Sequence, residues 1–447
     1  MLRGALSGAS LRPAQLVVAG FVVLICIGAL LLRLPLAVDP GITHPGWVDS
    51  LFWSTSASTV TGLGPTDVAD FSLFGELVLL ALIQIGGFGI MTVGSVVVLV
   101  LANRVGLRQR IIARTEIGAI ELGDLRDLMI AIAKITLVAE LGTAIFLFIA
   151  FARVEGTSAG AAAYQALFHG VSSFNNAGIS LFSDSLEGFV TNPMVIFPVS
   201  AAFIVGGLGF PVLVELWRRV RPLRWTLHTK ITLAATLVLL VYGPLVVLTF
   251  EWTNPDTLGP LSVLDKLQAS WFEGTTPRTA GFNVIPVGAL DESTELVTTV
   301  LMFVGAGSAS TSGGIKVTTF AVLFFVLWSE ARGDQETTVF HRRISYNVVR
   351  QAITVALLAV AIVFCTALAL TAISPFDFID TLFEATSAFG TVGLSTGITG
   401  ELSNWAELLL IGVMFVGRVG PVTFVAALAL RTRRRAYRYP EERPIIG

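Results

Sequence analysis

Eight apolar stretches, each long enough to cross a lipid bilayer, constrain this chain more than any other feature of its sequence. About twenty apolar residues span the hydrocarbon core as a helix. Charged residues make up only 13% of the chain, whereas about a quarter of residues are charged in soluble domains. The sequence therefore predicts an all-α integral membrane protein with eight transmembrane helices, at about residues 15–37, 71–102, 128–152, 190–217, 227–251, 295–328, 347–373 and 405–430.

Basic residues predict the orientation of these helices. Arginines gather near the termini and in alternate connections, and such residues accumulate on the cytoplasmic side. We therefore expect both termini in the cytoplasm, and we interpret the first stretch as a retained helix because no cleavage pattern follows it. The opposite connections are acidic and would attract cations. The cytoplasmic arginines are Arg104, Arg108, Arg110, Arg114, Arg218, Arg219, Arg221, Arg224, Arg342, Arg343, Arg431, Arg433, Arg434 and Arg435.

Each acidic connection also contains an apolar segment of ten to thirteen residues, at about 49–58, 162–174, 264–276 and 378–389. Segments of that length are too short to cross the membrane and indicate re-entrant helices. The chain is thus predicted to contain four M1-P-M2 repeats, each a helix, a re-entrant pore helix and a helix, around one central pore. The expected boundaries are an N-terminal segment 1–14, repeats at 15–102, 128–217, 218–328 and 329–430, a cytoplasmic linker 103–127 and a cytoplasmic tail 431–447.

A fixed spacing recurs in the four re-entrant segments. An aromatic residue is followed ten positions later by a glycine, in the pairs Phe52 and Gly62, Phe168 and Gly178, Trp271 and Gly281, and Phe383 and Gly393. Glycine permits backbone angles that aim successive carbonyls at one axis, and rings of carbonyl oxygens can replace the hydration shell of K+. We therefore expect K+ to bind at the carbonyls of a selectivity filter made of Val60, Thr61, Gly62, Asn176, Ala177, Gly178, Thr279, Ala280, Gly281, Thr391, Val392 and Gly393.

A second glycine cluster follows each filter glycine after 24, 28, 24 and 24 residues, beginning at Gly86, Gly206, Gly305 and Gly417. The longer interval places a small insertion at about residues 180–192 of the second repeat. Glycines in membrane helices also permit close packing, and this alternative stays open for Gly86 and Gly206.

The third of these clusters interrupts a predicted membrane helix. Residues 305–314 are all Gly, Ala, Ser or Thr, and Lys316 follows. Such a stretch does not favour a continuous helix, so we expect a flexible intramembrane gate beneath the filter, with a kinked packing helix as the alternative. The expected gate residues are Gly305, Gly307, Ser308, Ser310, Thr311, Ser312, Gly313, Gly314, Lys316 and Arg418.

Three single residues in or near the filter need an interpretation of their own. Arg418 lies at a depth where a charge costs a few kcal/mol; it is either an electrostatic barrier beneath the filter or the structural partner of a carboxylate such as Glu384. Arg278 is expected to point behind the filter, toward Glu273 or a carbonyl. His169 is expected to pack within its helix and not to bind a ligand.

With these motifs in hand, the chain resembles the Trk/Ktr/HKT superfamily of K+ transporters, and within it the Ktr branch. The four filter loops, Gly313-Gly314-Ile315-Lys316, Gly417-Arg418-Val419-Gly420-Pro421 and Tyr439-Pro440-Glu441-Glu442-Arg443 carry the resemblance. It implies K+ uptake across a bacterial plasma membrane, Na+ as an activator, no cofactor in this chain and no nucleic acid. It also implies a homodimer in membrane lipid, with a cytosolic ring of KtrA-like nucleotide-binding regulatory subunits. Relatives with serine at the position of Gly62 prefer Na+, so the resemblance favours K+ here.

Other functions fit the sequence less well. A poorly selective or Na+-coupled transporter of the same fold stays open. A secondary transporter of another solute typically has inverted repeats, whereas successive units here share one orientation. An enzyme is disfavoured because the histidines are scattered and no intramembrane cluster offers metal ligands or acid-base pairs. Cys26 and Cys365 lie in apolar runs and predict neither a disulfide nor a metal site.

Overall fold

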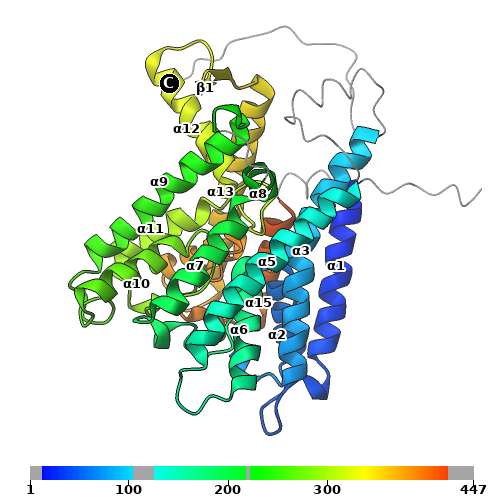
Figure 1. Ribbon diagram of the computed structural model, residues 1–447, viewed down its shortest axis with the longest axis vertical. Helices are drawn as coiled ribbons and strands as arrows, with labels where there is room; N and C mark the ends of the chain where they lie inside the picture. Colours follow the sequence, from blue (N-terminus) through cyan, green and yellow to red (C-terminus); the bar gives the residue numbers. More distant parts are fainter. Residues whose placement is uncertain (1–12, 104–124, 218–221, 421–447) are drawn as a thin grey trace, which may run out of the picture.

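The computed structural model describes residues 13–103, 125–217 and 222–420, and in these ranges helices dominate (Figure 1). The long helices are α1 (Pro13–Leu32), α3 (Leu73–Asn103), α5 (Leu125–Phe151), α9 (Leu227–Phe250) and α13 (Tyr346–Ile373). Within these described ranges, three helical segments are long and apolar enough to cross a membrane: Met129–Phe151, Leu227–Phe250 and Tyr346–Ile373. A bent pair of helices makes a fourth, and Val17–Leu32 and Leu73–Gly89 are shorter apolar helices.

Four shorter helices lie where the short apolar segments predicted them. They are α2 (Trp47–Thr59), α6 (Ala159–Phe174), α10 (Val263–Thr275) and α14 (Phe378–Gly390). Ser158 caps α6 and Ser262 caps α10, because each serine oxygen accepts a hydrogen bond from a backbone N–H in the first turn. Below, these four are called the short helices.

The short helices pack in a closed cycle with the helices that follow them. In the first, second and fourth units the short helix contacts the helix that follows it, called the inner helix: α2 with α3, α6 with α7 and α14 with α15. In every unit the inner helix contacts the short helix of the following unit. The contacts that link neighbouring units are α3 with α6, α7 (Pro193–Leu208) with α10, α11 (Glu292–Phe303) with α14, and α15 (Asn404–Val419) with α2. The last contact joins the end of the described chain to its beginning, so the four units surround one axis.

Two predicted spans are broken. The span expected at 190–217 is bent by 103° between α7 and α8 (Phe210–Trp217), because Gly209 adopts φ 90° and ends the first helix. The span expected at 295–328 is divided into α11 and α12 (Val317–Arg332), separated by a non-helical segment at 304–316. The predicted interruption at 305–314 is thus confirmed. Of the span expected at 405–430, residues 421–430 lie outside the described ranges.

In the third unit, the prediction that Trp271 is the counterpart of the phenylalanines in the other units is wrong. Phe52, Phe168 and Phe383 are fully buried, and their counterpart is Phe272, also fully buried, whereas Trp271 is only partly buried. Phe272 lies nine positions before Gly281, one fewer than in the other units. The backbone accommodates this difference, because Ala280 bonds four residues back to Thr276 where the other units bond five residues back.

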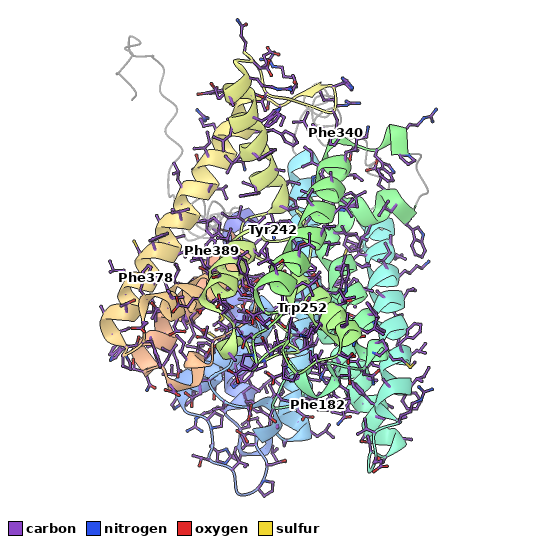
Figure 2. All side chains as sticks on the ribbon, turned by 90° about the vertical axis from the view of Figure 1, so that its left-hand side faces the viewer. Phe182, Tyr242, Trp252, Phe340, Phe378 and Phe389 are labelled. Atoms are coloured by element: carbon purple, nitrogen blue, oxygen red, sulfur yellow. The ribbon has the colours of Figure 1, made fainter. Side chains whose placement is uncertain are left out.

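A small hairpin was not predicted. Strands β1 (Thr338–Val339) and β2 (Arg342–Arg343) pair antiparallel in the connection between α12 and α13. Its turn residues Phe340 and His341 have φ of 47° and 61°, although neither residue type signals such a turn. Figure 2 places Phe340 near one end of the molecule and Phe182, which follows the second predicted filter loop, near the other.

Six 3-10 helices of three or four residues also occur in the described ranges. They are η1 (Pro35–Ala37), η2 (Val68–Asp70), η3 (Glu187–Phe189), η4 (Pro222–Arg224), η5 (Val287–Ala289) and η6 (Ile398–Glu401).

Candidate ion-conduction site

Four loops with the same unusual backbone follow the short helices. They are residues 60–62, 176–178, 279–281 and 391–393, and we call them the glycine loops. The first residue of each is left-handed, with φ of 57° at Val60, 59° at Asn176, 71° at Thr279 and 50° at Thr391. Left-handed backbone is strained for β-branched residues, and three of these four are β-branched. Strain of this kind gathers at functional sites, and here it recurs at one position in all four units.

The glycine that ends each loop is also left-handed, with φ between 64° and 98°. Hydrogen bonds to the preceding helix hold this shape in the first and fourth units. Thr61 N–H donates to Ser56 O at 2.8 Å, and Gly62 N–H donates to Ser56 Oγ at 3.0 Å. The fourth unit repeats the pattern, with Val392 and Gly393 donating to Ser387 at 2.9 and 3.1 Å. The same two bonds to a serine of the short helix therefore hold both of these loops.

The four glycines converge in a closed ring. A Cβ at Gly62 would lie closer than 3.0 Å to the carbonyl oxygen of Ala177, and the same holds for Gly178 with Ala280, Gly281 with Val392, and Gly393 with Thr61. Each glycine therefore lies against the carbonyl of the next unit, and the fourth closes on the first. The ring thus contains eight of the twelve predicted filter residues, and the other four directly precede them in the chain: Val60, Asn176, Thr279 and Thr391. A side chain at any of the four glycines would push the carbonyls apart.

The charge distribution at the ring suits a cation. The short helices end at Thr59, Phe174, Thr275 and Gly390, within six residues of the loop glycines. A helix C-terminus carries about half a negative charge, and four of them meet here. Carbonyl oxygens add further negative potential, so the ring attracts cations and repels anions.

A cavity of about 370 Å³ lies over one side of the ring, lined by all four loop glycines. We call it the vestibule. Its lining includes the carboxylates Asp67 and Glu187. Burial raises the pKa of Asp67, and the neighbouring Asp70 raises it further. Burial also raises the pKa of Glu187, assisted by Asp184 and opposed by a hydrogen bond from Asn283. These carboxyls therefore take up protons at a higher pH than exposed carboxyls do.

The segment 304–316 contacts the ring away from the vestibule. Val304 and Ile315 form a parallel bridge, so the two ends of the segment lie side by side. Thr311 Oγ1 donates to Asn176 Oδ1 at 2.8 Å, and a Cβ at Gly313 would overlap the side chain of Thr391. The segment thus touches the first residues of two glycine loops, Asn176 and Thr391.

The same segment is anchored by neighbouring backbone. Gly307 N–H donates to Gly207 O at 2.8 Å, and Phe210 N–H donates to Ala309 O at 3.0 Å. The bend at Gly209 brings α8 to the segment and makes the second of these bonds. Lys316 Nζ donates to the carbonyls of Ser312 and Gly313 at 2.5 and 3.2 Å, so this lysine folds back on its own segment.

Arg418 ties the segment to the helices around it. Its guanidinium donates to the carbonyl of Thr311 and, at 2.9 Å, to the carbonyl of Gly86 on α3. Glu384 accepts its hydrogen bond from Thr399, and within the described residues Arg418 forms no ion pair. The alternative of a pair between Arg418 and Glu384 is therefore wrong.

Arg278 and His169 lie where they were expected. Arg278 Nη2 donates to Thr236 Oγ1 on α9 at 3.2 Å, which places it behind the ring, although the partner is neither Glu273 nor a carbonyl. His169 bonds to Gln165 O and Ser180 Oγ at 2.8 and 3.0 Å and stacks on Phe182. Both residues have structural roles.

The inner-helix glycines pack against the last turns of the short helices, which settles the alternative left open for Gly86 and Gly206. A Cβ at Gly86, Gly206 or Gly417 would overlap the carbonyl oxygen four residues before the loop glycine, at Ser58, Phe174 or Phe389 respectively. In the third unit Gly305 has a different role, because its N–H donates to Ile315 O across the base of the segment 304–316.

One buried network was missed by sequence reasoning. Asn175, next to the second glycine loop, donates to Glu140 Oε1 on α5 and Gln84 Oε1 on α3, both at 3.0 Å. Glutamate and glutamine inside predicted membrane helices could have signalled it. Among the residues that the structure describes, no group of three His, Cys, Asp or Glu side chains could hold a metal ion.

The fold and the ring of carbonyls define a helical membrane protein of the cation-conducting class. A family model described as "Cation transport protein", TrkH, matches residues 9–433, and the chain belongs to this TrkH family. It is 41% identical to the Ktr system potassium uptake protein B of Bacillus subtilis over 97% of each chain.

Further relatives agree with this assignment. The chain is 38% identical to the Ktr system potassium uptake protein B of Vibrio alginolyticus, over 97% of this chain and 94% of the relative. It is 35% identical to the potassium/sodium uptake protein NtpJ of Enterococcus hirae, over 98% of each. Its fold is similar to that of the crystal structure of the potassium transporter TrkH from Vibrio parahaemolyticus, with a TM-score of 0.73 and 19% identity over 96% of this chain and 86% of that one.

Proposed function

We propose that this chain is the membrane subunit of a K+ uptake system, in which K+ crosses the bilayer through the ring of glycine loops. The observation that carries the proposal is the closed ring in which each loop glycine lies against the carbonyl of the next unit. Such a ring offers carbonyl oxygens in place of water. The names of the relatives from Bacillus subtilis and Vibrio alginolyticus support K+ as the ion.

In this proposal the chain forms four M1-P-M2 repeats with eight membrane crossings, and the short helices are re-entrant pore helices. The repeats occupy 15–102, 128–217, 218–328 and 329–430. The packing cycle through α15 and α2 supports this arrangement. The vestibule faces outside and both termini face the cytoplasm of a bacterium, as the arginine distribution predicts. Cations would gather in the vestibule near Asp67 and Glu187 before entering the ring.

The segment 304–316 acts as the gate in this scheme. Its contacts with Asn176 and Thr391 place polar atoms in the path of an ion that leaves the ring. Arg418 holds the segment in this position through Thr311 and adds positive charge beneath the ring. Opening then requires that the segment move away from both glycine loops.

The proposed assembly is a homodimer in membrane lipid with a cytosolic ring of KtrA-like nucleotide-binding subunits. The phrase "Ktr system" in two relatives' names supports a system of several components. Exposed apolar side chains along α9 and α13 supply surfaces for lipid, among them Leu237, Val238, Leu357 and Phe364.

A second function is transport of both K+ and Na+, with Na+ as a co-substrate or activator. The relative named potassium/sodium uptake protein supports it. Each unit contributes one short glycine loop, with one glycine, to the ring. The ring therefore offers fewer successive layers of carbonyl oxygens than a long filter would. Selectivity then depends on how rigidly one ring is held.

Growth of a bacterium that lacks its own K+ uptake systems tests the proposal. Expression of this chain with a KtrA-like subunit should restore growth at low external K+ but not change growth at high K+. Failure to restore growth, with the protein detected in the membrane, would count against K+ uptake. Restoration only when Na+ is added would support the second function.

A further inference from the structure

The residue directly after the buried phenylalanine of each short helix is itself buried and makes a polar contact. These residues are Trp53, His169, Glu273 and Glu384, and none is more than 3% exposed. Their side chains differ in chemistry, yet all four reach the segment that follows the glycine loop of their own unit. The recurrence is independent of the ring itself, because none of these four residues belongs to a glycine loop.

In the first two units the contact involves a hydroxyl group on that following segment. Trp53 Nε1–H donates to Thr66 Oγ1 at 3.0 Å. His169 Nε2 lies 3.0 Å from Ser180 Oγ, within hydrogen-bond distance. Trp53 also covers Gly64, because a Cβ there would overlap its ring.

In the last two units the residue is a glutamate. Glu273 Oε2 accepts a hydrogen bond from Val284 N–H at 3.3 Å. Glu384 Oε1 accepts one from Thr399 Oγ1, and Ser395 Oγ lies 2.9 Å from the same threonine oxygen. Each unit thus has one polar link between its short helix and the segment after its loop.

We infer that Trp53, His169, Glu273 and Glu384 are positioning residues that fix the width of the carbonyl ring. The glycine loop lies between the two segments that each link joins, so the link limits how far the loop can open. A ring that admits one ion at a fixed radius discriminates between K+ and Na+ only if its oxygens cannot follow the smaller ion inward. The inference rests on the proposed function and assigns its selectivity to four residues outside the ring.

Core packing alone does not account for these contacts. Burying a polar or charged group costs free energy unless it is hydrogen-bonded, and an apolar side chain would fill each position at lower cost. Thr66, Ser180, Ser395 and Thr399 also line the vestibule. In the first, second and fourth units the link therefore holds the wall of the vestibule, which a purely internal packing residue would not do.

The threonine of the fourth link gives a matched test. Thr399→Val removes the donor to Glu384 and keeps the side-chain volume, whereas Thr399→Ser keeps the hydroxyl. Thr371→Val is the control, because the Thr371 hydroxyl joins α13 to Thr381 at the start of α14 and does not reach the segment after the loop. The readout is the ratio of Rb+ to Na+ influx in proteoliposomes that contain the purified chain.

We expect Thr399→Val to lower the ratio by about threefold to tenfold, the effect of losing one buried hydrogen bond. Thr399→Ser and Thr371→Val should keep the wild-type ratio. Comparing Thr66→Val with Thr66→Ser repeats the test in the first unit. This second comparison tests the inference if Thr399→Val does not fold. A wild-type ratio in the valine variants would overturn the inference, whereas absence of Rb+ influx in the wild-type chain would instead refute the proposed function.

Discussion

The guanidinium of Arg418 donates a hydrogen bond to the backbone carbonyl of Thr311, in the middle of the gate segment. A second bond from Arg418, at 2.9 Å, reaches Gly86 on α3. One side chain of the fourth unit therefore joins the gate segment of the third unit to the inner helix of the first. In the proposed gate, Arg418 would act both mechanically, through these bonds, and electrostatically, through its charge.

Replacing Arg418 should open the gate. Arg418→Gln removes the positive charge and the pair of hydrogen bonds to Thr311 and Gly86. Hydrogen bonds of charged groups contribute about 1.5–3 kcal/mol each. We expect K+ influx to rise by about tenfold or more, measured as Rb+ uptake in proteoliposomes. Arg418→Lys keeps the charge but not the two bonds, so it separates the two roles. Influx equal to wild type in both variants would contradict the proposal that Arg418 holds the gate segment in place. Arg153→Gln, which removes a charge outside the site, serves as the control.

Removing the gate segment should raise influx as well. The bridge between Val304 and Ile315 holds the ends of the segment together, so deletion of residues 306–313 joins backbone that already lies close. We expect faster Rb+ uptake with unchanged expression, because the polar atoms beneath the ring are removed. Reduced uptake by a protein that is present and folded would show that the segment supports the ring.

The vestibule carboxylates should make uptake sensitive to external pH. Burial raises the pKa of Asp67 and of Glu187, so they lose their charge at a higher pH than exposed carboxyls as the medium is acidified. The apparent KM for K+ should then rise as pH falls, by about threefold at low ionic strength and less in 0.15 M salt, while the maximal rate stays constant.

A pair of variants checks the origin of that pH dependence. Combining Asp67→Asn with Glu187→Gln should raise KM at neutral pH and flatten its change with pH. Asp256→Asn, in an outer segment that does not line the vestibule, should keep the wild-type profile. If KM changes with pH in the double variant as it does in wild type, then Asp67 and Glu187 are not the source of the pH dependence.

Two glycines of α15 offer a matched test of how the inner helices support the ring. A Cβ at Gly417 would overlap the carbonyl oxygen of Phe389, whereas the space around Gly412 is open. Gly417→Ala should destabilise the protein by about 1–3 kcal/mol through overpacking, seen as a lower unfolding temperature in detergent. Gly412→Ala should have no such effect. Equal unfolding temperatures for the two variants would disprove the close approach of α15 to the last turn of α14.

The sequence predicted the short helices, the convergence of their glycines and the broken span because each has a local cause. Glycine adopts left-handed backbone at little cost, and a run of small residues disfavours a helix. The strained first residues of the loops were not predictable as such, since valine and threonine have no local preference for positive φ. They are held there by hydrogen bonds and by neighbouring units.

Other details depend on contacts between distant segments. Choosing Phe272 over Trp271 required knowing which aromatic side chain is buried, and counting intervals favoured the wrong one. The bend at Gly209 likewise depends on the gate segment, which receives the N–H of Phe210. The partner of Arg278 lies on α9, 42 residues away along the chain, beyond what local pattern can assign.

The most direct test of the carbonyl ring is Rb+ and Na+ influx into proteoliposomes that contain this chain alone, with Gly62→Ser compared against Gly142→Ala. Gly62 has φ 97° and faces Ala177, whereas nothing lies within 4 Å of a Cβ at Gly142. A side chain in left-handed backbone costs about 1–2 kcal/mol, which corresponds to about a fivefold to thirtyfold change in affinity. The account predicts selective Rb+ influx that Gly62→Ser weakens by that factor and Gly142→Ala retains. Selective influx that is identical in Gly62→Ser and wild type would contradict it.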